Sequence, residues 1–156
     1  MPMKKRLSEF LDEHGVKYII MVHSRAYTAQ ELAATLHVPG KMFAKTVILK
    51  ADNEPLMAVV PASYKINLEK FKKIAGAQEV ELASEEEFAS LFPHCELGAM
   101  PPFGMLYGLP TFVDQSLTEA EEIYFNAATH TEVMKMQFAD YQRLVEPVIA
   151  SFAEHV

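Results

Sequence analysis

The spacing of apolar residues predicts a chain of short helices and short strands that begins with a helix. Apolar and half-polar side chains recur every three or four residues near the start, as on one face of a helix, at Met3, Leu7, Phe10, Leu11 and His14. Gly15 follows where the C-terminal cap of such a helix is expected. The first element should therefore end at this glycine.

Runs of β-branched, aromatic and other apolar residues, bounded by turn residues, predict the strands. We expect strands over Val16–His23, Met42–Ala51, Leu56–Ala62, Leu109–Val113, Glu122–Asn126 and Glu132–Met136. The segment Asp52–Pro55 separates the second and third of these runs and is typical of a turn. These two strands should therefore pair with each other.

Further helices are expected from the residues that cap their ends. They are a helix from the Thr28–Glu31 capping box to His37, one from the Asn67 cap to Ala75, one after the Ser84 cap, and closing helices over Phe138–Val145 and Pro147–Glu154. Three glutamates directly after Ser84 suit the first turn of a helix, where the helix dipole favours negative charge.

The order of these elements decides the expected fold class. Adjacent short strands with helices around them favour a mixed sheet in an α/β fold over a doubly wound parallel sheet. No linker, repeat or low-complexity tract interrupts the pattern, and 156 residues suit one domain with a sizeable core. We therefore expect residues 1–156 to form a single domain.

Composition indicates a globular protein of the cytoplasm. Half of the residues (50%) are hydrophobic, and no apolar run approaches the roughly 20 residues of a membrane span. Ser8, Glu9 and Asp12 interrupt any signal-peptide core after the basic start of the chain. The lone cysteine, Cys95, excludes an internal disulfide and fits a reducing compartment. We expect a cytoplasmic location and no membrane partner.

Charge is distributed unevenly along a chain whose formal net charge is −7. Residues 41–73 hold seven lysines against three acids, whereas residues 74–134 contain eleven acids and neither Lys nor Arg. Most of the surface would repel a polyanion, which argues against non-specific coating of nucleic acid and against DNA as a partner. One basic patch between Lys41 and Lys73 remains to contact a few phosphates.

The segment Gly98–Gly104 combines two glycines with two adjacent prolines. Proline fixes its own φ and restricts the preceding residue, while glycine reaches conformations closed to other residues. We expect a loop that is stiff at its centre and can point the N–H groups of Gly98, Ala99 and Met100 at one ligand atom. Such loops build ligand and oxyanion sites, although Pro-Pro segments more often serve as plain connectors.

Lys45 lies inside the apolar run Met42–Leu49. On a strand it shares a face with Phe43, Val47 and Leu49, and the opposite face is largely apolar too, which is typical of a central strand. A lysine there either extends its long stem to the rim or is held buried for a function. The absence of another catalytic constellation favours the functional interpretation.

The other reactive residue types lack the spacing that their sites need. The chain has no Gly-x-Ser-x-Gly nucleophile elbow and no phosphate-binding glycine loop after a strand. Cys95 and His94 are neighbours in sequence, which rarely face each other, and nothing nearby would activate a thiolate. The six histidines show no metal-ligand spacing, so we expect no metal and no cofactor.

Three segments together resemble the YbaK/prolyl-tRNA synthetase editing-domain family. They are Phe43-Ala-Lys-Thr-Val47, the GxxxP pattern of Gly98-Ala-Met-Pro-Pro102, and the run Ile123-Tyr-Phe-Asn-Ala-Ala-Thr-His130. The likeness extends from the Thr28 capping box to Asp140-Tyr141, which is nearly the whole chain. It implies an α/β fold with a mixed, barrel-like sheet surrounded by helices, and a domain that hydrolyses mischarged aminoacyl-tRNA.

The resemblance also implies roles for individual residues. Lys45 matches the essential lysine of the family, and Gly98 and Pro102 match the fixed ends of its loop, so Lys45 and Gly98 are the expected catalytic residues. The substrate-binding residues are expected to be Ala99, Met100, Pro102, Asn126 and His130. Two departures bear on amino-acid preference, since Ala127 stands where the family usually has glycine and Met21 where some relatives have tyrosine.

The chemistry that this resemblance implies needs little from side chains. An aminoacyl ester is already activated, so the protein has to position water and stabilise the developing oxyanion. The expected partner is the acceptor end of a tRNA carrying alanine, serine or threonine, with a synthetase as a further candidate partner. A non-catalytic module that binds aminoacyl-tRNA or a synthetase is the main alternative, and a thiol hydrolase built on Cys95 is the least favoured one.

Overall fold

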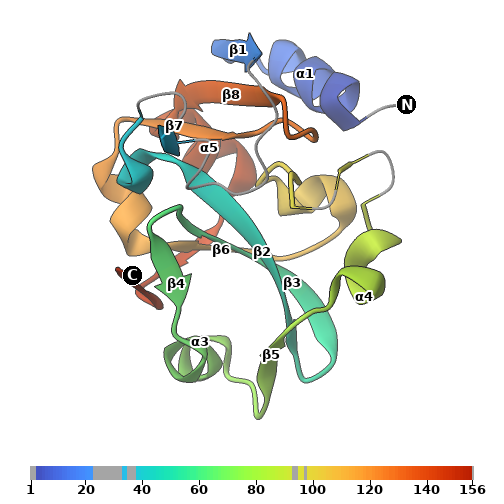
Figure 1. The fold of residues 1–156 in the computed structure, drawn as a ribbon, viewed down its shortest axis with the longest axis vertical. Helices are drawn as coiled ribbons and strands as arrows, with labels where there is room; N and C mark the ends of the chain where they lie inside the picture. The colour runs from blue at the N-terminus through green and yellow to red at the C-terminus, as the bar shows by residue number, and fades with distance from the viewer. Residues whose placement is uncertain (1–2, 23–32, 35–37, 93–94, 97, 156) are drawn as a thin grey trace.

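Three β-sheets form the centre of the molecule, and short helices cover their edges and outer faces (Figure 1). The computed structural model describes residues 3–22, 33–34, 38–92, 95–96 and 98–155. The strands are β1 Tyr18–Val22, β2 Ala44–Ala51, β3 Glu54–Pro61, β4 Tyr64–Ile66, β5 Val80–Leu82, β6 Thr111–Asp114, β7 Glu122–Asn126, β8 Glu132–Gln137, β9 Val148–Ala150 and β10 Ala153–His155. The helices are α1 Met3–Glu13, α3 Leu68–Ala75, α4 Glu85–Ala89 and α5 Phe138–Val145, with 3-10 turns η1 Gly40–Met42, η2 Gly104–Tyr107 and η3 Gln115–Glu119.

The largest sheet is mixed, as the sequence predicts. Its strand order is β5-β2-β3-β6-β9, with β2 antiparallel to β3 and β5, and with β6 parallel to β3 and β9. A second sheet, β1-β8-β7, is antiparallel, and β10 pairs with β4. The mixed α/β expectation is confirmed, although the described strands form three sheets and do not close into one barrel.

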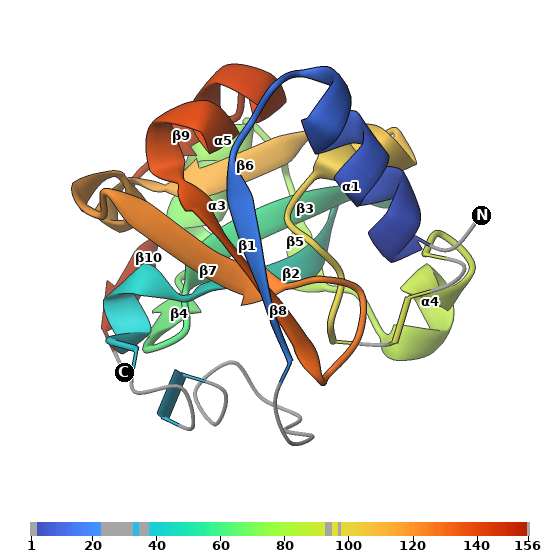
Figure 2. The same cartoon turned by 90° about the horizontal axis from the view of Figure 1, so that it is seen from above.

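One backbone bridge joins the two larger sheets and positions the site. Phe43, directly before β2, forms a parallel bridge with Tyr124 of β7. Seen from above (Figure 2), the β1-β8-β7 sheet lies in front of the larger sheet and β7 approaches β2. Residues of β2 alternate between the main core, which Ala44 and Ile48 enter, and a second cluster under α3, which includes Leu49.

Local signals in the sequence account well for the helix ends. The Asn67 side chain accepts a hydrogen bond from the Lys70 N–H at the start of α3, and Ser84 and Glu87 form a capping box at α4. Helix α5 has the expected bounds, and α1 ends just before Gly15. The expected helix from Thr28 lies outside the described residues except for residues 33–34, which are helical.

Two expectations about the turns and the end of the chain are wrong. The β2–β3 turn is shorter than expected, because Asp52 and Asn53 both adopt left-handed backbone angles, with φ of 50° and 69°, and β3 starts directly after them. The expected helix over Pro147–Glu154 is instead the strands β9 and β10. The buried Asp114 carboxylate accepts hydrogen bonds from the N–H groups of Phe152 and Ala153, which fixes this extended path.

Candidate functional site

The candidate site lies where the two larger sheets meet. The bridge between Phe43 and Tyr124 sets β2 beside β7 in parallel. Side chains two positions along parallel strands return to the same face, so Lys45 and Asn126 share one face of this junction. This arrangement unites two residues that are 81 positions apart in the sequence.

The edge of β2 is open beside Lys45. Strand β5 pairs with β2 only from Leu49 to Ala51, and the Phe43 bridge lies at the other end. In the described part of the chain, no strand pairs with the intervening residues 44–47 on this edge. This edge of β2 at Lys45 is therefore not covered by a paired strand of the described chain.

The Lys45 side chain is half-buried at this edge of β2. Burial lowers the pKa of its ammonium group below the usual 10.5. Other lysines near the sheets are paired: Lys50 contacts Glu81 and Glu87, and Lys135 Nζ lies 3.7 Å from Glu122 Oε2. No such ion pair involves Lys45 within the described residues. A buried, unpaired cation of this kind is typical of a binding or catalytic group.

Asn126 offers a buried polar atom on the same face. Its side chain is 6% exposed, and its Oδ1 atom has no hydrogen-bond partner in the described structure. A buried amide oxygen without a partner is unusual, because desolvation then goes uncompensated. Val133 of β8 and Met21 of β1 lie in the same row across the sheet. This row across the sheet therefore places the Asn126 amide oxygen next to apolar side chains.

The Gly98 loop, residues 98–104, is held against the turn that follows β7. Gly98 has a φ of 85°, and a side chain there would stand 3.5 Å from Cε1 of His130. The Ala128 N–H donates to the Ala99 carbonyl, and the Glu96 N–H donates to the Ala128 carbonyl. His130 is buried, and its backbone N–H donates to the Glu96 carboxylate at 3.2 Å. The structure thus brings together the two segments that the sequence separates.

Two of the expected backbone donors already have partners in or next to the loop. The Ala99 N–H donates to the Glu96 carbonyl at 3.0 Å. The Gly98 N–H donates to the Met100 thioether sulfur at 3.3 Å. Sulfur is a weak acceptor, so a carbonyl or oxyanion could replace it at the Gly98 N–H at little cost. Of these two donors, Gly98 is therefore the better placed to change partners.

The Pro102 end of the loop is fixed by a hydrogen bond from the core. The Pro102 carbonyl accepts a hydrogen bond of 2.6 Å from the Tyr141 hydroxyl. Tyr141 is completely buried, and burial raises the pKa of its phenol, so it remains a neutral donor. Its ring also packs edge-on against Phe103, at a centroid distance of 5.3 Å. Pro102 thus has a positional role, since its carbonyl faces the core.

Strand β7 connects the two halves of the site. Its third residue, Tyr124, forms the bridge to Phe43, and the strand ends at the turn that holds the Gly98 loop. Asn126 is the last residue of this strand. No hydrogen bond or ion pair joins Lys45 directly to Gly98 among the described residues, so a substrate would have to bridge them.

The thiol and the histidines form no second centre in the described residues. Cys95 Sγ lies 3.2 Å from the Tyr107 hydroxyl, and burial raises the pKa of the thiol, which opposes thiolate formation. No group of three or more His, Cys, Asp or Glu side chains within the described ranges could hold a metal ion. His94, next to Cys95, lies outside those ranges.

Among the described residues, none of the helices has the length and apolar character needed to cross a membrane.

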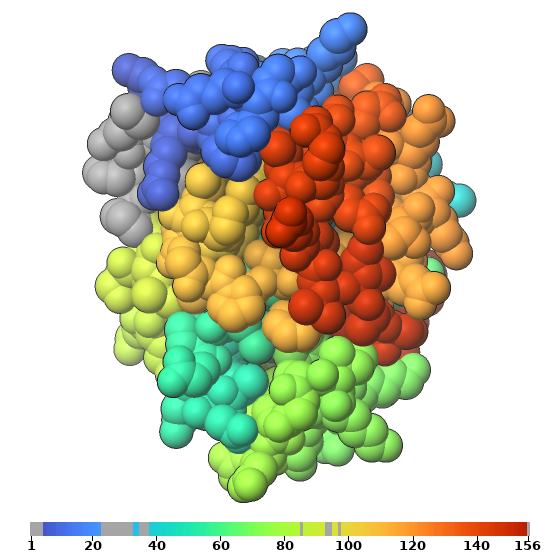
Figure 3. All heavy atoms as spheres, turned by 180° about the vertical axis from the view of Figure 1, so that it is seen from behind, coloured from blue at the N-terminus to red at the C-terminus, as the bar shows by residue number. Residues whose placement is uncertain are grey.

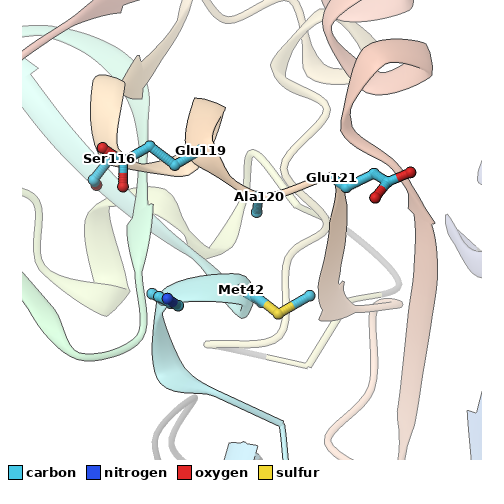
Figure 4. Close-up of a pocket in the computed structure, with 6 residues that line it drawn as sticks. Met42, Ser116, Glu119, Ala120 and Glu121 are labelled. Atoms are coloured by element: carbon cyan, nitrogen blue, oxygen red, sulfur yellow. The ribbon is translucent and has the colours of Figure 1, made fainter.

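A separate cavity of about 220 Å³ lies between η1 and η3 and contains none of the predicted site residues. Figure 4 shows Ser116 and Glu119 of η3 on one side of it and Met42 of η1 on the other. Lys41 and Glu121 also line it, so acidic and basic groups are mixed. This mixture gives the cavity no clear preference for an anion.

Sequence reasoning missed a groove that Lys45 itself lines. The groove has a volume of about 300 Å³ and is lined by Lys45, Val47, Lys65, Ile66, Leu68 and Leu82. The signal available in the sequence was Lys65 between Tyr64 and Ile66, a second lysine in apolar surroundings. The strands that place Lys65 and Leu82 there are only three residues long, too short to show an alternating pattern.

Comparisons with known proteins find a family model and a relative that each match most of the chain. The model of the family described as aminoacyl-tRNA editing domain matches residues 23–144. The chain is 26% identical over 153 residues to the multifunctional Ser/Thr-tRNA deacylase ProXp-y of Escherichia coli (strain K12), covering 95% of this chain and 91% of that protein.

Two further comparisons concern larger proteins and the fold. The chain is 31% identical over 88 residues to a proline--tRNA ligase of Bacillus cereus (strain Q1), a match that covers 56% of this chain but only 15% of the ligase. The crystal structure of hypothetical protein APE2540 superposes with a TM-score of 0.85 at 21% identity, covering 95% of this chain and 99% of that one. The second comparison supports the fold alone.

Proposed function

The chain belongs to the aminoacyl-tRNA editing domain family, and on that premise we propose that it hydrolyses the ester bond of mischarged aminoacyl-tRNAs carrying a small amino acid. The relative that it matches over nearly its whole length is named a Ser/Thr-tRNA deacylase, which supports this reaction and this substrate class. The chain spans only 15–22% of the proline--tRNA ligases that it matches, so it corresponds to a part of those enzymes.

The observation that carries the proposal is the half-buried ammonium group of Lys45 at the junction of β2 and β7, which forms no ion pair with any residue that the structure describes. A tRNA end presents phosphates and an ester carbonyl, and a desolvated ammonium group binds either through charge-assisted hydrogen bonds. Its location beside an open strand edge allows the substrate to reach it. Lys45 would therefore anchor the reacting end of the tRNA.

The Gly98 loop would stabilise the negative charge that develops on the ester oxygen. The Gly98 N–H donates to a weak sulfur acceptor without substrate, and exchanging this partner for an oxyanion strengthens the hydrogen bond. Backbone donors held in place need no reorganisation during the reaction. A vicinal ribose hydroxyl of the substrate can orient the attacking water, so the proposal needs no side chain as general base.

Asn126 would contact the amino acid itself. Its buried Oδ1 can accept a hydrogen bond from the hydroxyl of serine or threonine or from the α-amino group. The apolar side chains of Met21 and Val133 in the same row limit the space available. We expect serine, threonine and alanine esters to be accepted and phenylalanine and leucine esters to be excluded sterically.

The experiment that tests this function compares five charged tRNAs. Purified protein is incubated with tRNAs carrying serine, threonine, alanine, leucine or phenylalanine, and the release of each amino acid is followed over time. Rapid release of small amino acids, with little release of large ones, is the expected result. The matched variant Cys95→Ser should keep this activity, since the thiol is protonated and bonded to Tyr107.

The main alternative, a non-catalytic module that binds the same tRNA ends, makes the opposite prediction. Such a protein would bind charged tRNA without releasing the amino acid. Failure of the protein to release any of the five amino acids, despite measurable binding, would support that alternative and contradict the proposed hydrolase.

A further inference from the structure

The groove beside Lys45 has a composition that suits one particular ligand. Two lysines, Lys45 and Lys65, stand at it, and the remainder of its lining is apolar. Leu82, at the end of β5, is 61% exposed although it is a large apolar side chain. An exposed apolar surface flanked by cations fits a molecule with a flat apolar face and phosphate groups.

We propose that this groove binds the 3′-terminal nucleotide of the tRNA, with its base against Val47, Ile66, Leu68 and Leu82 and its phosphates near Lys45 and Lys65. The proposal rests on the proposed function. It adds the location of the nucleotide, because the aminoacyl group attached to the ribose would then pass Lys45 toward Asn126 and the Gly98 loop.

The structure of β2 explains why the groove lies there. Strand β5 leaves β2 at the pair Leu49–Leu82, so the edge of β2 before Leu49 has no neighbour from β5. Strand β4 and the first residue of α3 form the opposite wall. The groove therefore lies at the part of β2 that β5 does not cover, and Lys45 lines it.

Charge continues from the groove along α3. Lys70, Lys72 and Lys73 lie on this helix, and Glu154 of β10 lies 3.6 Å from Lys70 and opposite Lys65. Lys72 and Lys73 have no ion pair among the described residues. Their charges are available to the backbone of the acceptor stem, which follows the terminal nucleotide. Helix α3 thus extends the positively charged surface beyond the groove.

The size of the groove is consistent with this ligand. Its volume of about 300 Å³ lies at the lower end of the range of roughly 300–1,000 Å³ found for small-molecule sites. A single nucleotide is a ligand of this scale, and a duplex is far larger. The groove would therefore accept an unpaired tRNA end and leave the stem outside.

The test measures binding of an uncharged CCA trinucleotide, which requires no catalysis. Lys65→Glu should weaken this binding about tenfold or more, because a charge-assisted contact becomes a repulsion. Lys5→Glu is the matched control, because α1 lies at the opposite end of the molecule from α3 (Figure 3) and Lys5 is exposed there. The control should change the dissociation constant by less than about twofold.

A second pair of variants tests the base contact. Leu82→Ala should weaken binding of CCA about threefold, and Val148→Ala, an exposed apolar residue on β9 at the other edge of the sheet, should not. Replacing the terminal adenosine by an abasic ribose should remove the difference between wild type and Leu82→Ala. Thermal melts of all four variants establish that each is folded at the assay temperature.

The outcomes separate this inference from the proposed function. Equal dissociation constants for Lys65→Glu and Lys5→Glu, in a protein that deacylates its substrate, overturn the nucleotide groove and leave the hydrolase intact. The inference is also overturned if Lys65→Glu weakens binding but the protein binds CCA and the abasic oligonucleotide equally well. The base would then make no contact with the groove. Lack of deacylation by the wild-type protein contradicts the proposed function instead.

Discussion

The two halves of the candidate site hold their functional groups in different ways. On the β2 side, Lys45 extends a charged side chain from a regular strand, and its effect depends on what that side chain is. On the loop side, Gly98 contributes a backbone N–H, and backbone hydrogen bonds through Ala99 and Ala128 fix its position. Substitutions should therefore act through chemistry in the first half and through shape in the second.

The most severe test of this contrast is Lys45→Ala. We expect deacylation to fall by roughly 100-fold or more, because the variant loses a charge placed at the reacting end. The circular-dichroism spectrum should not change, since the side chain is only half-buried and forms no ion pair within the described residues. A variant that retained nearly full activity would remove Lys45 from the mechanism.

The second test addresses the loop and should have a smaller effect. Gly98→Val places a β-branched residue at a φ of 85° and 3.5 Å from the His130 ring, so turnover should fall by tenfold or more. Met100→Ala removes the weak sulfur acceptor and part of a buried side chain but leaves the backbone of Gly98 unrestricted, so it should cost less activity. Initial rates of both variants decide the question, and equal, small effects would show that the segment is only a connector.

The third test uses pH and concerns the charge of Lys45 alone. Burial lowers its pKa, so kcat/KM should decline as pH rises through a value below 10.5. An unfolded chain would hold this proton more tightly, so the contribution of Lys45 to stability increases over the same pH range. Loss of the Lys45 proton should therefore lower the activity without unfolding the protein.

Rates corrected for spontaneous ester hydrolysis, together with thermal melts at each pH, measure this effect. A rate that stays constant up to the pH at which an ordinary lysine loses its proton would contradict the role of a desolvated ammonium group.

The fourth test concerns amino-acid choice. Asn126→Ala removes the buried amide oxygen and should slow release of serine and threonine by about tenfold, while alanine should be less affected. Competition between serine- and alanine-charged tRNA gives the ratio directly. If both esters slow equally, Asn126 contacts the α-amino group or supports the fold, and it does not recognise the hydroxyl.

The smallest effect is expected from a chelator. The described residues contain no group of three metal-ligating side chains, and the proposed mechanism uses none. Dialysis against a strong chelator should therefore leave the rate unchanged. Loss of activity that added zinc restores would redirect attention to His94, Cys95 and His130.

Local sequence signals predict most helices and the longer strands, because their causes lie within a few residues. The Asn67 and Ser84 caps and the bounds of α5 are examples. The end of the chain is different: a helix over Pro147–Glu154 and the observed strands are both compatible with its apolar residues. The deciding contact comes from Asp114, which is 38 residues before Phe152.

The site shows the same division between local and distant causes. Lys45 and the Gly98 loop are visible in the sequence as departures from ordinary strand and loop patterns. Their arrangement depends on the parallel bridge between Phe43 and Tyr124, which no local pattern encodes. Lys65 and Leu82 escaped notice for this reason, since distant strand pairing alone brings them to Lys45.

The turn after β7 stores conformational energy at the site. Ala128 adopts a φ of 77°, a left-handed angle that costs an alanine about 1–2 kcal/mol. Its N–H and carbonyl are both bonded to the loop segment, to Ala99 and Glu96, and these bonds hold the residue in that state. Any movement that detached the loop would let Ala128 relax. The strained conformation of Ala128 is therefore maintained by the same hydrogen bonds that hold the Gly98 loop in place, so strain at this turn and the position of the loop are coupled.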